Sequence, residues 1–470
     1  MFRYSFLLLL VAVWLSCKKD SVITSPDALL RTSADTLRFD TVFTTVGSIT
    51  KNLTVVNAND QRMVISSIQL KGGANSPYSI NVNGVSGTSF SNLSLNANDS
   101  LYIFARVSIN PSSSQLPFIV RDSIEITYNG NTRKIQLEAY GQNARFISSG
   151  RISANTTWDN ALPYVIVKPL TVTEGVTLTI TEGTRVYCNA NAPLIVNGTL
   201  KALGKFYDST RIRFRSDRLD GDYKDLPGTW PGIYFNNSSS NNEMNYVDVL
   251  NAYQAVLVQG GPSLTPAKLR MNGCVIDNAY DFGLLAFNTS LNVVNSRFTQ
   301  IGNDGTPGNG GSNIIISGGG NYVFNHCSIA TYANFYQNHK QPSMFITNNA
   351  NGTGQPLTLQ MDNSIIYGQG GLTENELVTQ KTGTAPFAIT MRNVLYKVKT
   401  DPADISFSNS LKNLDPLFDT INTSLRLFNW RLRDGSPCID AGIPGGPPTD
   451  LDGKPRPVGT KPDLGCYEKQ

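Results

Sequence analysis

The stretch Asn272-Gly273-Cys274-Val275-Ile276 recurs in altered form along the second half of the chain. Each copy places a small residue two positions before an apolar one, and an asparagine closely precedes most copies. The copies are Val247-Asp248-Val249, Cys274-Val275-Ile276, Ser296-Arg297-Phe298, Cys327-Ser328-Ile329, Ser364-Ile365-Ile366 and Val394-Leu395-Tyr396. Their first residues lie 27, 22, 31, 37 and 30 positions apart. Repeats of roughly 20 to 50 residues indicate stacked units that bury their faces against one another.

These repeats contain short strands and Asn/Gly turns rather than helical periodicity. Parallel strands stacked as the coils of a solenoid fit that pattern, whereas a leucine-rich repeat would show regularly spaced leucines that this sequence lacks. The variable spacing indicates loops of different length between coils of constant size. We therefore predict a parallel β-solenoid over residues 146–410, with roughly nine or ten coils at this period.

The composition favours an all-β chain. Only 16% of the 470 residues are charged, and the sequence holds 46 Asn, 40 Gly and 24 Pro, which suit turns and are poor in helix interiors. The net charge is 39 − 35 = +4, and no Lys/Arg-rich run accompanies it, which argues against a nucleic-acid partner. Two histidines leave little material for a histidine metal site or a catalytic triad.

The N-terminus predicts export. Residues 1–16 carry Arg3 and then an apolar run that is too short to span a bilayer, as in a signal peptide. Cys17 follows directly and resembles the lipidated cysteine of a bacterial lipobox, although Trp14 stands where an aliphatic residue is typical. The alternative is an ordinary signal peptide with an incidental cysteine. Residues 17–35 are polar and are expected to form a tether from the membrane.

Residues 36–145 are predicted to form an Ig-like β-sandwich. Short alternating strands, such as 37–43, 51–56 and 101–107, are separated by turn signals such as Asn129-Gly130. This region contains no cysteine, so it carries no disulfide between sheets.

Several segments resemble right-handed parallel β-helix proteins of the pectate-lyase-like type. The coil-like segments are 179–186 (TITEGTRV), 194–204 (LIVNGTLKALG) and 227–235 (PGTWPGIYF). The last 60 residues resemble the C-terminal choice-of-anchor Q region of surface β-helix proteins, through 415–418 (DPLF), 432–442 (LRDGSPCIDAG), 450–457 (DLDGKPRP) and 463–468 (DLGCYE). Together with the opening 40–43 (DTVF), the mature chain looks like a Bacteroidetes surface lipoprotein. The resemblance implies that residues 411–470 cap the β-helix.

Cysteines depart from the pattern of that family. Cys438 and Cys466 stand where the family usually has a small residue, which suggests a disulfide across the C-terminal cap; two buried thiols are the alternative. Cys274 and Cys327 are expected to face the solenoid bore two coils apart, too far to bond. With Cys188, the cysteines after Cys17 number five, so we expect at least one unpaired buried thiol.

β-Helices of this type bind or cleave polysaccharide along one face, so candidate residues were sought in the loops. The best cluster follows the Cys327 coil: Tyr332, Phe335 and Tyr336 could stack on sugar rings, and His339 or Lys340 could act as the base of a lyase. The alternative is an aromatic loop that packs on the solenoid.

Other candidate functional residues have weaker support from the sequence. Asp248 and Asp277, the nearest pair of carboxylates for a hydrolase, are interpreted as solvated turn residues. His326 precedes a cysteine that faces the bore, which predicts an outward, surface side chain.

We therefore expect an exported protein at the outer membrane or cell surface, anchored in the membrane through Cys17. Its β-helix would bind a polysaccharide or a surface protein without catalysis. The alternatives are a polysaccharide lyase that acts on an acidic glycan by β-elimination and a purely structural surface protein. No cofactor is expected, Ca²⁺ enters only under the lyase alternative, and we expect a monomer.

Overall fold

The computed structural model describes residues 21–44, 47–110, 118–260, 267–302 and 311–470. The chain divides into two compact units, residues 1–143 and 144–470. The described residues form strands and three short 3-10 helices, η1 (Gly73–Asn75), η2 (Asp208–Thr210) and η3 (Gly221–Asp225), without any α-helix. The predicted all-β class is confirmed. None of these helices is long and apolar enough to cross a membrane.

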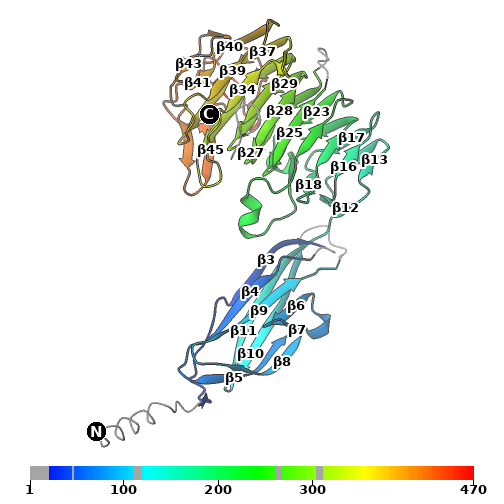
Figure 1. The fold of residues 1–470 in the computed structure, drawn as a ribbon, viewed down its shortest axis with the longest axis vertical. Coiled ribbons are helices and arrows are strands. Elements are labelled where there is room, and N and C mark those ends of the chain that lie inside the picture. The colour runs from blue at the N-terminus through cyan, green and yellow to red at the C-terminus, as the bar shows by residue number, and fades with distance from the viewer. Residues whose placement is uncertain (1–20, 45–46, 111–117, 261–266, 303–310) are drawn as a thin grey trace, which may run out of the picture. The chain divides into compact units, whose positions relative to one another are not determined.

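The first unit contains two sheets that enclose one hydrophobic core (Figure 1). The six-stranded sheet comprises β1 (Val22–Ile23), β3 (Thr36–Phe43), β5 (Arg62–Leu70), β8 (Ser89–Leu95), β10 (Phe118–Tyr128) and β11 (Asn131–Gln142). The five-stranded sheet comprises β2 (Leu30–Thr32), β4 (Lys51–Asn57), β6 (Tyr78–Val82), β7 (Val85–Gly87) and β9 (Ser100–Val107). Alternate residues of β9, such as Leu101, Ile103 and Ala105, are buried, because successive side chains of a strand point to opposite faces.

The structure describes only part of the predicted N-terminal tether, residues 17–35. Cys17 and the signal peptide lie outside the described residues. Part of the predicted tether is wrong, because β1 pairs with β5 and β2 pairs with β4. Leu30 is buried in the core of the first unit, so apolar contacts hold this segment in the sheets.

The described part of the second unit is built from three parallel sheets whose strands alternate along the chain, an arrangement consistent with a β-solenoid. The eleven-stranded sheet comprises β12 (Arg145–Ile147), β15 (Tyr164–Ile166), β18 (Arg185–Cys188), β21 (Ile212–Ser216), β24 (Val247–Leu250), β27 (Val275–Asp277), β30 (Arg297–Thr299), β33 (Ser328–Tyr332), β38 (Ile365–Gln369), β41 (Leu395–Tyr396) and β43 (Leu411–Lys412). The nine-stranded sheet comprises β13 (Arg151–Ile152), β16 (Leu170–Val172), β19 (Leu194–Val196), β22 (Ile233–Phe235), β25 (Gln254–Gln259), β28 (Phe282–Phe287), β31 (Ile314–Ser317), β34 (Met344–Thr347) and β39 (Leu377–Gln380). The ten-stranded sheet comprises β14 (Thr156–Trp158), β17 (Thr177–Thr181), β20 (Thr199–Leu203), β23 (Asn242–Asn245), β26 (Leu269–Asn272), β29 (Leu291–Val294), β32 (Gly320–Asn325), β37 (Leu357–Asp362), β40 (Phe387–Arg392) and β42 (Ile405–Ser408).

The repeat seen in the sequence forms one stack of side chains in the core. The third residue of each copy pairs in register with the same residue of the next copy. These residues are Val249, Ile276, Phe298, Ile329, Ile366 and Tyr396. Each of these side chains packs against its equivalents in the neighbouring coils, which supplies the hydrophobic stabilisation that a single coil cannot provide.

Asparagines form the corner between the ten-stranded and eleven-stranded sheets. Four asparagines directly follow strands of the ten-stranded sheet and adopt a left-handed conformation, with φ between 48° and 53°: Asn295, Asn363, Asn393 and Asn409. His326 occupies the same corner with φ 51°. Asparagine tolerates this conformation better than most residues, which explains why it recurs at this corner.

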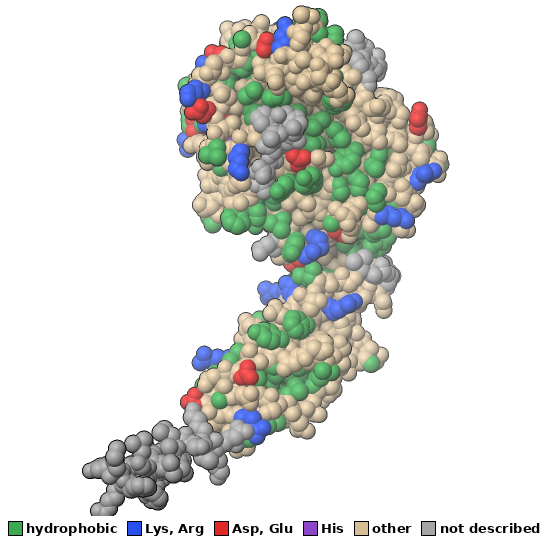
Figure 2. Space-filling view, in the orientation of Figure 1, with side chains coloured by type: hydrophobic (Ala, Val, Ile, Leu, Met, Phe, Trp, Pro, Cys, Tyr) green, Lys and Arg blue, Asp and Glu red, His purple; other side chains and the backbone are tan. Residues whose placement is uncertain are grey.

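The outer faces of the sheets differ. The nine-stranded sheet carries an apolar ladder on its outer face, and Figure 2 shows hydrophobic side chains gathered over β25, β28 and β34. The ladder comprises Ile195, Tyr234, Leu257, Leu285, Ile315, Phe345 and Val378.

The chain after β43 lies on the outer face of the eleven-stranded sheet. Tyr467 accepts a hydrogen bond at its hydroxyl from Arg297 Nη1 (2.9 Å), and Trp430 and Leu464 join a hydrophobic cluster with Val275 of β27. Figure 1 shows β45 (Leu427–Leu432) beside that part of the solenoid. This C-terminal segment, residues 413–470, therefore covers strands far from the last coil.

The predicted Cys438–Cys466 disulfide is wrong. Both residues are buried free thiols, as are Cys188, Cys274 and Cys327. The backbone carbonyl of Cys438 accepts from the amide of Leu464, and Cys466 Sγ instead donates to Ser328 Oγ (3.3 Å) on the solenoid. Cys438 and Cys466 therefore have different neighbours and do not bond to each other. As expected, Cys274 and Cys327 lie in the solenoid core.

Candidate functional site

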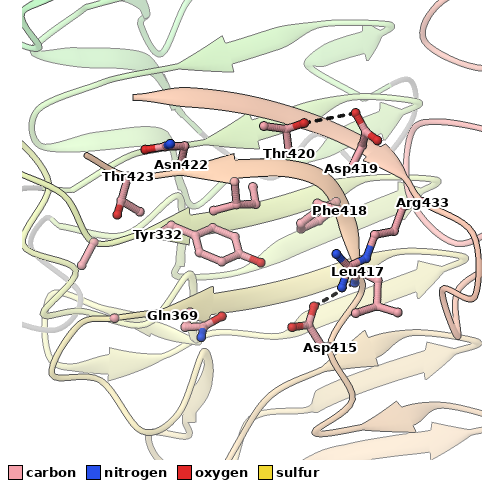
Figure 3. A pocket seen from close by; sticks show the side chains of 13 residues that line it. Tyr332, Gln369, Asp415, Leu417, Phe418, Asp419, Thr420, Asn422, Thr423 and Arg433 are labelled. Atoms are coloured by element: carbon pink, nitrogen blue, oxygen red, sulfur yellow. Dashed lines mark hydrogen bonds between the residues drawn. The ribbon is translucent and has the colours of Figure 1, made fainter. Parts of the chain in front are cut away.

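A hairpin of the C-terminal segment forms one wall of a groove in the second unit. β44 (Phe418–Asn422) pairs antiparallel with β45, and the hairpin lies over the ends of β33 and β38. Between them is a cavity of about 620 Å³, which we call the hairpin groove (Figure 3). A groove of this size is in the range that binds small molecules or a few sugar units.

Tyr332 forms the floor of the hairpin groove. It is the last residue of β33, and Figure 3 shows its ring surrounded by the other labelled side chains. Its ring lies 5.9 Å from the ring of Trp430 and 6.4 Å from that of Phe418. Burial raises the pKa of the Tyr332 hydroxyl far above its ordinary value, so this group stays protonated. The floor is thus a rigid aromatic surface.

Polar side chains rim the groove. Asp415 accepts a hydrogen bond from the amide of Leu417 (2.8 Å), and Asp419 accepts from Asn429 Nδ2 (2.6 Å). The Arg433 guanidinium and the Gln369 amide line the groove without a hydrogen bond to another described residue. The rim therefore offers free donors beside carboxylates whose orientation is fixed.

The aromatic loop predicted after the Cys327 coil is only partly exposed. Phe335 is 90% exposed, and Lys340 is also exposed. Tyr336 is half-buried beneath the Arg426 guanidinium, which lies 4.4 Å from its ring. Among these aromatic residues, Tyr332 lines the hairpin groove, whereas Phe335 and Tyr336 do not.

His339, one of the two candidate bases on this loop, is not accessible to solvent. Its side chain is buried, and Nε2 lies 2.8 Å from Glu376 Oε1. Ser343 Oγ donates to the other oxygen of Glu376 (2.8 Å). A Cβ at Gly368 would lie 2.3 Å from His339 Nε2, so no room remains for a substrate there. This cluster holds the loop in place.

The expectation of a surface His326 is also wrong. The side chain points outward from the solenoid but is fully buried beneath the C-terminal segment. Its Nε2 lies 3.0 Å from Asn363 Nδ2.

The two carboxylates considered for hydrolysis are not solvated turn residues. Asp248 is buried and forms an ion pair with Arg211 (2.6 Å). Asp277 is half-buried on β27, where it accepts a hydrogen bond from Thr299 Oγ1, and burial raises its pKa. No group of three or more His, Cys, Asp or Glu in the described ranges is arranged to hold a metal ion.

Sequence reasoning missed most of the groove. Asp415 and Arg433 appeared only within family-like motifs, and Gln369 was not singled out. The position of Asp415 immediately before Pro416, in a segment without repeats, was the available signal that this stretch leaves the solenoid.

Comparisons with known proteins name no relative. No family model matches the sequence, and no curated protein matches it. Among solved structures, a family 123 glycoside hydrolase from Clostridium perfringens shares 12% identity over 24% of this chain and 25% of that chain, with a TM-score of 0.18. PapD-like domain 7 of human CEP192 shares 11% identity over 27% of this chain and 92% of that chain, with a TM-score of 0.17. The Pseudomonas fluorescens alkylpurine DNA glycosylase AlkC shares 12% identity over 25% of this chain and 31% of that chain, with a TM-score of 0.16. This chain thus spans a quarter of the hydrolase and under a third of the glycosylase, and these scores carry no argument about function.

Proposed function

We propose that this protein is an exported, lipid-anchored surface protein that binds glycan without cleaving it, through the hairpin groove. The observation that carries the proposal is the combination of unpartnered polar groups and an aromatic floor. Arg433 and Gln369 present donors in the same groove as the Asp415 carboxylate, and Tyr332 lines it as well. Sugars are recognised by this pairing of planar polar groups with an aromatic ring.

The same proposal includes the address and the finer architecture. Cys17 would carry the lipid, the first unit would be an Ig-like spacer, and the second unit would be a right-handed β-helix ending in a choice-of-anchor Q region. The chain would then be a Bacteroidetes surface lipoprotein. The signal-like run before Cys17 and the C-terminal motifs support this assignment.

A lyase receives less support than a binding protein. The base considered for β-elimination, His339, is buried against Glu376, and Lys340 does not line the hairpin groove. β-Elimination needs a base within hydrogen-bond reach of the proton that it removes. Binding without turnover is therefore the result that we expect.

The test is binding and turnover on an array of acidic and neutral polysaccharides. We expect retention of at least one glycan by the protein, with no unsaturated product, and at least tenfold weaker binding by Arg433→Ala. Lys399→Ala, an exposed cation outside the groove, serves as the matched control and keeps its binding. Absence of binding to every glycan, or equal binding by Arg433→Ala, would reject the groove as the site.

The lipid anchor is tested separately by metabolic labelling with a radioactive fatty acid in a bacterial host that processes lipoproteins. The wild-type chain is expected to incorporate label and to fractionate with membranes, whereas Cys17→Ala incorporates none. Label in Cys17→Ala would refute Cys17 as the lipidated residue.

A further inference from the structure

A second pocket lies beside the other strand of the hairpin. Its cavity of about 260 Å³ is lined by Asp277 of β27, by Arg215 of β21, and by Arg426 and Phe428 of the hairpin. Gln337, from the loop after β33, closes it from another side. We call this cavity the Asp277 pocket. It is smaller than pockets for drug-sized ligands, so it has room for one small polar molecule.

The walls of the Asp277 pocket contain buried polar atoms without partners. Gln337 is 1% exposed; its Nε2 donates to Asn278 Oδ1 (2.6 Å), whereas its Oε1 has no hydrogen-bond partner among the described residues. The Nε atoms of Arg215 and Arg426 are likewise buried and unpartnered. Buried polar groups in folded proteins are almost always hydrogen-bonded to protein or to water, so three unpartnered atoms around one cavity favour a polar ligand there.

We propose that the Asp277 pocket binds a single neutral hexopyranose unit, held through its hydroxyls. This inference presupposes a glycan ligand, as the proposed function does, but assigns it a separate site.

The two arginines determine which chemistry fits. Arg215 Nη2 donates to the carbonyl of Lys224 (2.9 Å), and Arg426 Nη2 donates to the carbonyl of Asp225 (2.8 Å). A guanidinium binds a carboxylate most strongly through two parallel N–H groups, on Nε and Nη2. In both arginines Nη2 already donates to a backbone carbonyl. The Nε–H of each arginine has no partner among the described residues and can donate to a hydroxyl oxygen.

The acceptors complete the pattern. Gln337 Oε1 is free, and Asp277 uses one oxygen for Thr299 while its carboxylate faces the cavity. Both can accept hydrogen bonds from the hydroxyls of a ligand. Phe428 supplies an apolar wall for the carbon–hydrogen face of a ring. Lone donors, acceptors and an aromatic wall around a small cavity match a polyhydroxylated ring.

The experiment measures binding of methyl glucoside, methyl galactoside and methyl mannoside to the full chain in a detergent without a sugar head group. Saturation-transfer NMR and calorimetry are compared with glucuronate and galacturonate. We expect at least one neutral glycoside to bind, and Gln337→Leu and Asp277→Asn each to weaken it about tenfold, the loss of one hydrogen bond. Phe335→Ala, an exposed change on the same loop as Gln337, is expected to bind like the wild type.

Arg433→Ala separates this site from the hairpin groove. It is expected to lose polysaccharide binding and to keep glycoside binding, so the two proposals fail independently. Asp277→Asn replaces a carboxylate by an amide of the same shape, which keeps the test valid if Gln337→Leu does not fold. The proposal is overturned if no neutral glycoside binds, if uronates bind more tightly, or if folded Asp277→Asn binds like the wild type.

Discussion

Asn363 and Ile443 exchange two hydrogen bonds although 80 residues separate them. Asn363 Nδ2 donates to the carbonyl of Ile443 (3.1 Å), and the amide of Ile443 donates to Asn363 Oδ1 (2.8 Å). Asn393 Nδ2 similarly donates to the carbonyl of Ala441 (2.7 Å). The corner asparagines Asn363 and Asn393 therefore also fasten the C-terminal segment to the solenoid.

Asn363→Gly tests this fastening. Glycine keeps the left-handed corner without strain but leaves the backbone of Ile443 without its partners. We expect the free energy of unfolding to fall by about 2–3 kcal/mol, the value of two or three lost hydrogen bonds. Tryptophan fluorescence in a denaturant titration measures it, because the described tryptophans, Trp158, Trp230 and Trp430, all lie in the second unit.

Asn409→Gly is the matched control. Asn409 has φ 48° at the same corner, and its side chain is exposed and bonded to no described residue. The same change there costs only backbone entropy, less than about 1 kcal/mol. Equal losses in the two variants would show that the corner, and not the link to the C-terminal segment, carries the effect.

A buried ion pair within the C-terminal segment gives a second prediction. Arg456 Nε lies 3.0 Å from Glu468 Oε2, with the side chains 2% and 1% exposed. Arg456 also donates to Asn295 Oδ1 of the solenoid (3.0 Å). Glu468→Gln leaves a buried guanidinium without its counter-charge, so we expect a loss of about 3–5 kcal/mol in unfolding free energy.

The control for this prediction is an exposed pair. Lys399 and Glu374 are in contact at 3.0 Å with side chains 68% and 64% exposed. Glu374→Gln should cost less than about 1 kcal/mol, because water screens the charge that remains. Thermal and denaturant unfolding of the two variants decide the matter, and similar losses would contradict the assigned role of burial.

The repeated part of the fold could be predicted because its physical signal is local. A small residue two positions before an apolar one places both side chains toward the core, as Cys274 and Ile276 do. Before several copies an asparagine marks the left-handed corner, at residues such as Asn295 and Asn363. Because the inward-facing residues and the corner recur from coil to coil, the sequence pattern was sufficient to predict stacked parallel strands.

The candidate sites could not be predicted in this way because they depend on contacts between distant segments. Arg297 and Tyr467 are 170 residues apart, and the C-terminal segment that carries Tyr467 has no repeat. The outward direction of His326 was correct, but a second layer of chain covers it. The hairpin groove and the Asp277 pocket both arise where that layer meets the solenoid, which no periodicity reveals.

The cysteines give a third prediction. Cys274 and Cys327 are fully buried, and burial raises the pKa of each thiol to about 12, so thiolate is scarce at neutral pH. We expect native protein to resist iodoacetamide, and denatured protein to be alkylated without reductant at all five cysteines after Cys17. Mass spectrometry of the digest measures the alkylation of each cysteine. If Cys438 and Cys466 stayed unmodified in the denatured sample, the free thiols assigned here would be contradicted.

The fourth prediction concerns acid. Burial lowers the pKa of His326 to about 3, and the nearby positive charge of Arg456 acts in the same direction. The unfolded chain takes up a proton on this imidazole below about pH 6.5, whereas the folded chain does not. Its contribution to stability is therefore complete above that pH and is lost as the pH falls toward 3. Between pH 7 and pH 4.5 we expect a loss of about 2.5 kcal/mol from this residue.

His326→Asn isolates the effect, because asparagine suits the left-handed corner that His326 occupies. Asp463 complicates the wild-type profile: burial raises its pKa to about 6, so it becomes protonated in the folded chain first and opposes the loss over the same range. That contribution is common to both proteins and cancels in their difference. Denaturant titrations at pH 7 and pH 4.5 should show that His326→Asn loses about 2.5 kcal/mol less than the wild type. Parallel pH profiles would mean that the buried imidazole is protonated without cost, contrary to its position beneath the C-terminal segment.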